Sequence, residues 1–293
     1  MVEAVASSSS ASKNRRWLRP LSTCVGAATF LYATTLRLVD SPLICCPRLI
    51  VLSGLDSRLL GHLLPLSVPI AALLAAVGSA VGTGRTFRIA RGVLFSAGLV
   101  GIALIVHAAG SLIDIKGGAP AGGAILGFVG ASIILAASLL GFGTMDNEKD
   151  SRLLAGSLRH VGPVSILLGA GLFTVALLMP WTTRPFPLRL VNLPPGPYRI
   201  WSTVVPSAIV IPVVVAAVRM LPGLRQRQGE LGIALAGGIF ATLVFVRVAG
   251  RVVTSAPPPF PPVFSLKIGA YIGLAAGSLM VLGALFHALV LRR

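Results

Sequence analysis

Acidic residues are scarce in this chain: 293 residues hold only 8 Asp and Glu against 25 Lys and Arg, and charged residues make up 11% of the total. About a quarter of the residues of a soluble domain are charged, so an ordinary soluble domain is excluded. The three cysteines are too few for a disulfide framework and show no metal-ligand spacing. What is abundant is apolar: 55% of the residues are hydrophobic and the mean hydropathy is +0.90, which predicts a multi-pass membrane protein.

The few acids also avoid the middles of the predicted membrane spans. Asp40, Asp56 and Asp114 fall in predicted loops, so proton-coupled transport through a buried carboxylate has little support. The four histidines are scattered over different segments, which excludes a clustered metal site. No nucleophile, base and orienting group converge, so we expect no catalytic residues, no metal and no cofactor. The net charge of +17 lies mainly between apolar segments, where membrane topology and anionic headgroups explain it better than nucleic acid does.

Apolar segments of spanning length recur along the chain. A spanning helix needs about 20 predominantly apolar residues. Seven segments meet this length clearly: Leu63–Val81, Ile89–Ala109, Gly122–Phe142, Val161–Pro180, Thr203–Leu221, Leu231–Ala249 and Lys267–Leu291. An eighth segment, Leu18–Leu38, is diluted by serine and threonine and is counted because of the internal repeat described next.

An internal repeat organises these segments. The stretch Pro163–Pro180 has a weaker copy at Pro20–Arg37, offset by 143 residues. The same offset pairs Gly130 with Gly273, and an offset of 140 pairs His107 with Arg247. We therefore predict an all-α integral membrane protein of eight transmembrane helices, arranged as two parallel four-helix repeats.

The repeat defines the predicted domains and the topology. We expect a disordered cytoplasmic N-terminus at 1–17, repeats at 18–142 and 161–293, and a polar cytoplasmic linker at 143–160. Fifteen of the 25 Lys and Arg fall on the side of the N-terminus, so the positive-inside rule places both termini in the cytoplasm. Cys45 and Cys46 then lie in an outer loop, either as incidental thiols or as a vicinal disulfide.

Four basic residues near the predicted outer helix ends form one candidate site: His107, Arg247, Arg37 and Arg251. If the repeats are parallel, His107 and Arg247 occupy equivalent places and form an anion or lipid-headgroup site with the two arginines. Alternatively, these side chains reach the interface individually by snorkelling.

Basic residues and glycines form two further patterns. Arg85, Arg88 and Arg91 follow one stripe of a helix on the cytoplasmic side, where we expect contact with anionic lipid or, alternatively, with the acidic surface of a partner. Glycines recur at every fourth position, which allows close helix packing, either within the monomer or between copies. These glycines are Gly123 and Gly127 in the fourth span, and Gly269, Gly273 and Gly277 in the eighth.

The motif Leu-Met-Pro-Trp at Leu178–Trp181 resembles the end of the first helix in small actinobacterial four-span membrane proteins. The resemblance covers about residues 161–291 and implies a bacterial plasma membrane location, with no activity attached. Together these features favour a non-catalytic scaffold or accessory subunit of a bacterial envelope complex, whose partners are the anionic bilayer and other membrane proteins. The alternative is a membrane carrier for an anionic or lipid-linked substrate.

Overall fold

The computed structural model describes residues 2–40, 55–82, 84–116, 118–139, 158–181, 197–221, 228–253 and 266–290. These residues form eight α-helices and one short two-stranded ribbon. Six of the described helices are long and apolar enough to cross a membrane: α2 (Leu55–Val81), α3 (Arg85–Lys116), α4 (Gly122–Leu139), α5 (Leu158–Leu178), α7 (Gln228–Val253) and α8 (Ile268–Val290). The apolar part of α6 (Pro197–Arg219) is shorter, at Thr203–Arg219. The chain is therefore a helical membrane protein, as its composition predicts.

The helices follow the predicted segments closely, and the second, third and seventh helices extend beyond them. Strands β1 (Val39–Asp40) and β2 (Ala119–Pro120) pair antiparallel. The helices are α1 (Val2–Thr35), α2 (Leu55–Val81), α3 (Arg85–Lys116), α4 (Gly122–Leu139), α5 (Leu158–Leu178), α6 (Pro197–Arg219), α7 (Gln228–Val253) and α8 (Ile268–Val290).

Helix α1 differs from the prediction at its N-terminus. We expected residues 1–17 to be disordered, but α1 runs from Val2 without a break into the apolar segment. Residues 2–17 include no glycine or proline that would end a helix, and alanine has the highest helix propensity. Of the predicted linker at 143–160, residues 143–157 lie outside the described residues, and α5 begins at Leu158.

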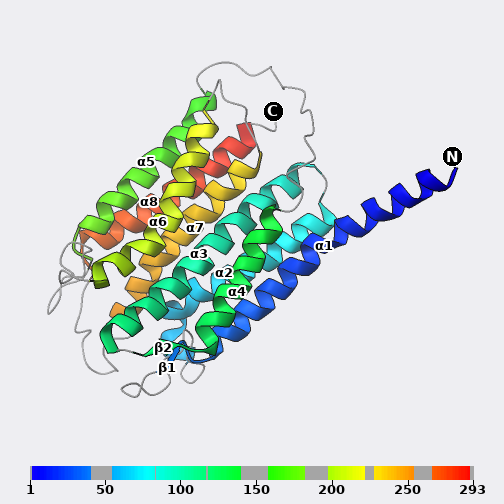
Figure 1. Ribbon diagram of the computed structural model, residues 1–293. Helices are drawn as coiled ribbons and strands as arrows, with labels where there is room; N and C mark the ends of the chain where they lie inside the picture. The colour runs from blue at the N-terminus through cyan, green and yellow to red at the C-terminus, as the bar shows by residue number, and fades with distance from the viewer. Residues whose placement is uncertain are drawn as a thin grey trace.

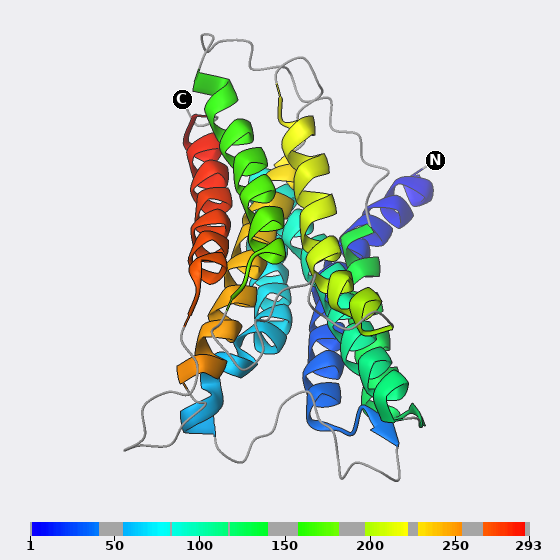
Figure 2. The ribbon, with the colours of Figure 1, turned by 90° about the vertical axis from the view of Figure 1, so that its left-hand side faces the viewer.

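The helices assemble so that the first and last of each half pair most closely. Helix α1 packs along α4, and α5 packs along α8. Between these pairs, α3 contacts α7, while α2 reaches α7 and α6 reaches α3 across the middle. Figure 1 shows the two pairs on opposite sides of the bundle, and Figure 2 shows α3 and α7 diverging toward their C-terminal ends. The cross-contacts make the two halves one unit.

The same positions are buried in matching helices of the two halves. In α1, the buried positions from Arg19 to Thr34 recur 143 residues later from Gly162 to Leu177 in α5. In α4, the buried positions from Gly123 to Ser138 recur 146 residues later in α8, where His287 is the one addition. This corrects the predicted alignment of Gly130 with Gly273: Gly130 matches Ala276, because three more residues separate the matching helices.

Backbone contacts repeat with the same offsets. The amide of Gly123 donates to the carbonyl of Arg37 at 2.8 Å, and that of Gly269 donates to the carbonyl of Pro180 at 3.2 Å. The amide of Ala121 donates to Leu38, and that of Lys267 to Trp181. Each bond ties the start of the last helix of a half to the chain just after its first helix, and in the first half these bonds lie next to the β1–β2 ribbon.

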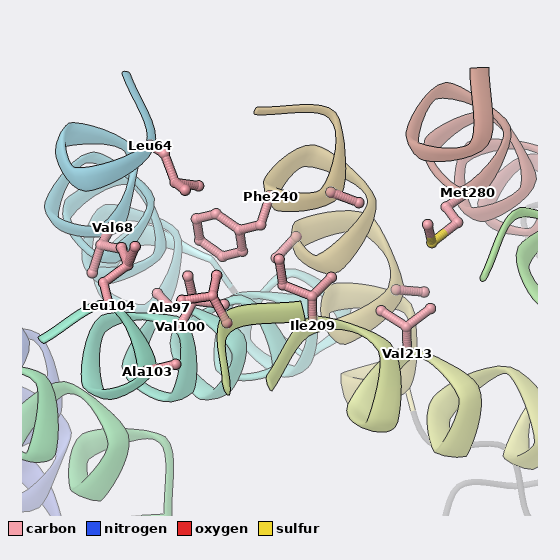
Figure 3. Packing of buried hydrophobic residues seen from close by; sticks show 14 of the residues in the cluster. Leu64, Val68, Ala97, Val100, Ala103, Leu104, Ile209, Val213, Phe240 and Met280 are labelled. Carbon is pink, nitrogen blue, oxygen red and sulfur yellow. The ribbon is translucent and has the colours of Figure 1, made fainter. Parts of the chain in front are cut away.

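The core lies between the halves and is apolar. Figure 3 shows Phe240 of α7 among Leu64 and Val68 of α2 and the apolar residues of α3, with Ile209 of α6 beside them. All four side chains are buried, with at most 3% of their surface exposed. Lipid-facing side chains such as Leu74 and Val77 of α2 are exposed instead, as expected for helices in a bilayer.

Candidate functional site

The two ends of the bundle differ in charge. We call the end that holds the start of α3 and the last turn of α8 the charged end, because Arg85, Arg91, Glu230 and His287 lie there. The opposite end holds the β1–β2 ribbon and is called the ribbon end. Figure 1 shows the first part of α1 and the end of α8 on the same side of the bundle.

The predicted anion site of His107, Arg247, Arg37 and Arg251 belongs to the ribbon end. His107 and Arg247 are half-buried, and each takes part in a polar, charged or ring interaction. The helices that carry them, α3 and α7, end on opposite sides of the bundle in Figure 2. Arg37 is exposed, and its backbone carbonyl accepts the Gly123 amide. The side chain of Arg251 and both cysteines of the outer loop lie outside the described residues, so the site stays a prediction.

The three arginines of the predicted stripe reach different helices. The Arg85 guanidinium donates to the carbonyl of Ala288, at the end of α8, with an Nη2–O distance of 2.7 Å. Nε of Arg91 donates to the carbonyl of Ser138, at the end of α4, at 2.8 Å. Arg88 is half-buried between them and also has an interaction. Because the last carbonyls of a helix lack partners within the helix and carry partial negative charge, α3 caps the last helix of both halves.

A fourth arginine joins this group from α1. Arg19 is buried, with 6% of its surface exposed. Its guanidinium carbon lies 4.2 Å from the centre of the Phe87 ring, a cation–π contact. Its Nε and Nη1 atoms are buried and have no hydrogen-bond partner within the described residues. Among the described residues, the positive charge of Arg91 acts on Arg19, so two arginines lie close to each other where α1 meets α3.

The matching place in the second half carries no such charges. Arg19 corresponds to Gly162, Arg91 to Leu231, and Ser138 to Ala284, with the offsets of 143, 140 and 146 found for their helices. There His287 fills the space, since a Cβ atom on Gly162 would lie 2.6 Å from the His287 Cβ. The second half thus replaces two arginines with small and apolar residues and one buried histidine.

The charged end also holds one buried acid. Glu230 lies in the first turn of α7 and is 5% exposed. Its Oε1 atom is 3.9 Å from Nη1 of Arg219, in the last turn of α6. The acid lies at a helix N-terminus and the base at a C-terminus, so both are favoured by the helix dipoles. This arrangement serves the joint between α6 and α7.

The predicted glycine rows face the interior of the bundle. A Cβ atom on Gly269 would lie 2.8 Å from the carbonyl oxygen of Pro180, and one on Gly127 would lie 2.5 Å from the tip of Ile105. Gly123 lies against the Arg37 carbonyl, Gly273 against the Phe245 ring and Gly277 against Thr242. All five are buried within the monomer.

The tightest helix crossing was missed by the sequence pattern. Gly92 of α3 lies directly against the carbonyl of Gly229, and Gly232 of α7 lies directly against the carbonyl of Ile89. Ile89 and Gly229, like Gly92 and Gly232, are 140 residues apart, so the crossing is a reciprocal pair of contacts. No four-residue spacing marks these glycines in either helix, and only the offset of 140 links them.

The described residues contain no group of three or more His, Cys, Asp or Glu side chains that could hold a metal ion. No protein-family model, curated protein or solved structure matches the chain. In the described part of the chain, the features that bear on function are therefore the charged end, the half-buried His107 and Arg247 at the ribbon end, and the apolar core between the halves.

Proposed function

We propose that the chain is an eight-span bacterial plasma membrane protein with both termini in the cytoplasm, built from two parallel four-helix repeats. In this proposal it has no catalytic activity and acts as a scaffold or accessory subunit of an envelope complex. The coinciding burial of α1 with α5 and of α4 with α8 supports the repeat. The shared burial pattern also supports counting α1 as a span, because its counterpart α5 is one of the six helices that are long and apolar enough to cross a membrane.

The observation that carries the scaffold role is the apolar core between the halves. Carriers built from repeats hold their substrate near the midplane at the interface of the repeats, on unwound helices and polar groups. Here that interface consists of buried side chains such as Val100, Leu104, Ile209 and Phe240, on continuous helices. Among the described residues, the buried ionisable groups Arg19, Glu230 and His287 lie at the charged end instead. An apolar interface of this kind suits a protein that binds partners through its outer faces.

Purification in a mild detergent tests the scaffold role. We expect the tagged protein to be recovered with one or more membrane proteins in a fixed ratio. When the tag is placed on such a partner instead, this chain should be recovered with it. Isolation of the chain alone from its native membrane, in each of several mild detergents, would contradict the role.

The carrier alternative gives a different result in a double variant. The half-buried His107 and Arg247 are the observation that favours it. In a carrier, His107→Ala with Arg247→Ala abolishes stabilisation by an anionic substrate, because two ligand charges are lost. In a scaffold, the double variant keeps its partners, and its melting temperature responds to anions as that of the wild type does.

Thiol labelling tests the topology. We expect a membrane-impermeant maleimide to label Cys45 and Cys46 from outside intact cells under reducing conditions, while a cysteine introduced at Ser8 is labelled only after permeabilisation. Cys24 lies inside α1 and is exposed toward the lipid side, so Cys24→Ser provides the background control. Labelling of the position 8 cysteine in intact cells would overturn the orientation.

A further inference from the structure

We propose that the two halves carry equivalent binding sites for a phosphate oxyanion, one at each junction where the first and the last helix of a half meet at the charged end. The first junction joins α1 and α4, and its site is built on Arg19. The second joins α5 and α8, and its site is built on His287. The inference rests on the fold and is independent of the scaffold role.

Two buried side chains at the charged end have nitrogen atoms that lack a hydrogen-bond partner. Among the described residues, these atoms are Nε and Nη1 of Arg19 and Nδ1 of His287. Arg19 is 6% exposed and His287 is 2% exposed. Burial of a polar group without a partner is costly, and more so when the group is charged. Both side chains therefore require an acceptor that the described residues do not supply.

The two side chains occupy the same junction from opposite helices. Arg19 corresponds to Gly162 at the offset of 143, and His287 corresponds to Gly141, which lies outside the described residues, at the offset of 146. In the second half, a Cβ atom on Gly162 would lie 2.6 Å from the His287 Cβ, so the glycine leaves room for the histidine. Each half thus has one basic side chain and one glycine at these positions, with the two helices exchanged. A basic group is kept at the junction in both halves, although its position in the chain is not.

A guanidinium and a ring lie together at each junction. In the first half, the Arg19 guanidinium carbon lies 4.2 Å from the centre of the Phe87 ring. In the second half, Nη2 of Arg85 donates to the carbonyl of Ala288 at 2.7 Å, and the charge of Arg85 acts on His287. Among the described residues, no carboxylate forms an ion pair with either arginine. An anion from outside the chain therefore matches both junctions in charge.

The donors and the depth of both sites favour phosphate. The planar donors of a guanidinium match a phosphate group, and a histidine nitrogen donates to an oxyanion when it carries its proton. Both sites lie near the ends of spans, at the depth of lipid headgroups, and exposed leucines lie beside them, as residues that contact acyl chains do. These leucines are Leu18 and Leu21 on α1 and Leu285 and Leu289 on α8. Two sources supply the ligand: the phosphodiester of an anionic phospholipid and free inorganic phosphate.

Native mass spectrometry of the full-length protein tests the number of sites. The protein is stripped of lipid in a neutral detergent and then mixed with phosphatidylglycerol or with phosphatidylcholine. We expect the wild type to retain two molecules of phosphatidylglycerol, Arg19→Gln and His287→Leu to retain one each, and the double variant to retain none. Binding at each altered site should weaken about tenfold or more, as loss of a hydrogen bond to a charged group does. Phosphatidylcholine, which has no net charge, should be retained less.

Arg37→Gln and His160→Leu are the matched controls. Arg37 is exposed near the ribbon end, and His160 is exposed at the start of α5. Each control therefore removes the same kind of side chain from an exposed position, and both variants should retain two lipid molecules.

The melting temperature separates binding from a structural role. Without lipid or phosphate, Arg19→Gln and His287→Leu should melt no lower than the wild type, because each removes buried nitrogen atoms that lack a partner. With phosphatidylglycerol, the wild type should melt higher than either variant. If a variant fails to fold, Arg19→Lys and His287→Phe provide the same comparison, because lysine lacks the planar donors and phenylalanine keeps a ring without a donor.

Each outcome decides the proposal. Loss of one lipid molecule in each single variant supports it. Inorganic phosphate then identifies the source: an equal rise in the melting temperature, lost in the same variants, identifies free phosphate, and a rise with phosphatidylglycerol alone identifies the lipid. A single retained lipid in the wild type, or a loss in only one of the two variants or in neither, overturns the proposal. Equal losses in the controls, or equal retention of phosphatidylcholine, also overturn it.

Discussion

The two halves bury matching positions and differ in which side chains occupy them. At the charged end, the first half holds Arg19 and Arg91 where the second half holds Gly162 and Leu231. At the ribbon end, it is the second half that has additional side-chain contacts. There Phe245 makes edge-to-face contacts with Phe173 and Trp181, with ring centres 5.6 and 5.5 Å apart.

The first half has Phe30, Ile105 and Leu38 at the places of these three aromatic residues. What both halves retain is a set of small residues at the helix contacts, such as Gly26 with Gly169 and Gly123 with Gly269. In a bilayer, apolar side chains gain nothing over lipid by association, so close backbone packing is the term that holds helices together. The comparison teaches that the glycine contacts define the fold, while the side chains at each end are free to acquire different roles.

The largest expected effect comes from the crossing of α3 and α7. Gly92→Ala places a methyl group on the Gly229 carbonyl, and Gly232→Ala places one on the Ile89 carbonyl. Because backbone atoms cannot move aside, we expect each variant to lose about 3 kcal/mol of the free energy of unfolding. Reversible denaturation in mixed micelles measures both losses. If the halves are related by a two-fold axis at this crossing, the two losses are equal.

Gly171 is the matched control for these variants. It lies on the exposed face of α5, and a Cβ atom there would meet nothing within 4 Å. Gly171→Ala should therefore leave the protein unchanged or stabilise it by about 0.5–1 kcal/mol, the gain in helix propensity of Ala over Gly. Losses at position 92 or 232 no larger than the effect at position 171 would contradict the close crossing.

A smaller, unequal effect is expected at the contact between the third and last helices of each half. A Cβ atom on Gly273 lies against the ring of Phe245, whereas one on Gly127 meets the flexible tip of Ile105 at 2.5 Å. The Ile105 methyl group can rotate away, but the Phe245 ring is held by two aromatic neighbours. We expect Gly273→Ala to cost about 2 kcal/mol and Gly127→Ala about 1 kcal/mol, measured by the same denaturation. Equal costs would show that the aromatic cluster adds no rigidity.

The smallest effect concerns the polar contact of that cluster. Nε1 of Trp181 donates to the carbonyl of Ala176 at 2.6 Å, and Leu38 in the first half has no such donor. Trp181→Phe keeps an aromatic ring and loses the hydrogen bond, so we expect a cost of about 1 kcal/mol. Trp17→Phe is the control, because Trp17 is 63% exposed. A cost for Trp181→Phe no larger than that for Trp17→Phe would show that the hydrogen bond contributes little.

The amino-acid sequence was sufficient for the helices and insufficient for their partners. Long apolar segments bounded by Arg, Pro and Gly predict where α2 to α8 lie, because a bilayer allows few other structures. The burial of Gly26 and Gly169 follows from the repeat, which was visible as an offset of 143. The offset of 140 was visible in the pairing of His107 with Arg247, but the offset of 146 between α4 and α8 needed the structure, because loop lengths shift each helix separately and single matching glycines do not fix a register.

The charged end was predicted only in part. Arg85, Arg88 and Arg91 were expected to face lipid as one stripe, and a stripe alone does not reveal that α3 lies between two helix ends. Arg19 falls at the start of the predicted first span, Leu18–Leu38, and the sequence does not show that its side chain turns inward. The arrangement depends on tertiary contacts between residues 47 and 203 positions apart.

The bond from Arg85 to Ala288 has a mechanical consequence. It ties the last helix of the chain to the third, and α3 also contacts α2, α4, α6 and α7. A load applied to the C-terminus is therefore carried by α3 into both halves rather than peeling α8 away alone. The molecule should yield to force as one unit, and a pulling experiment on Arg85→Gln should show α8 detaching in a separate, earlier step.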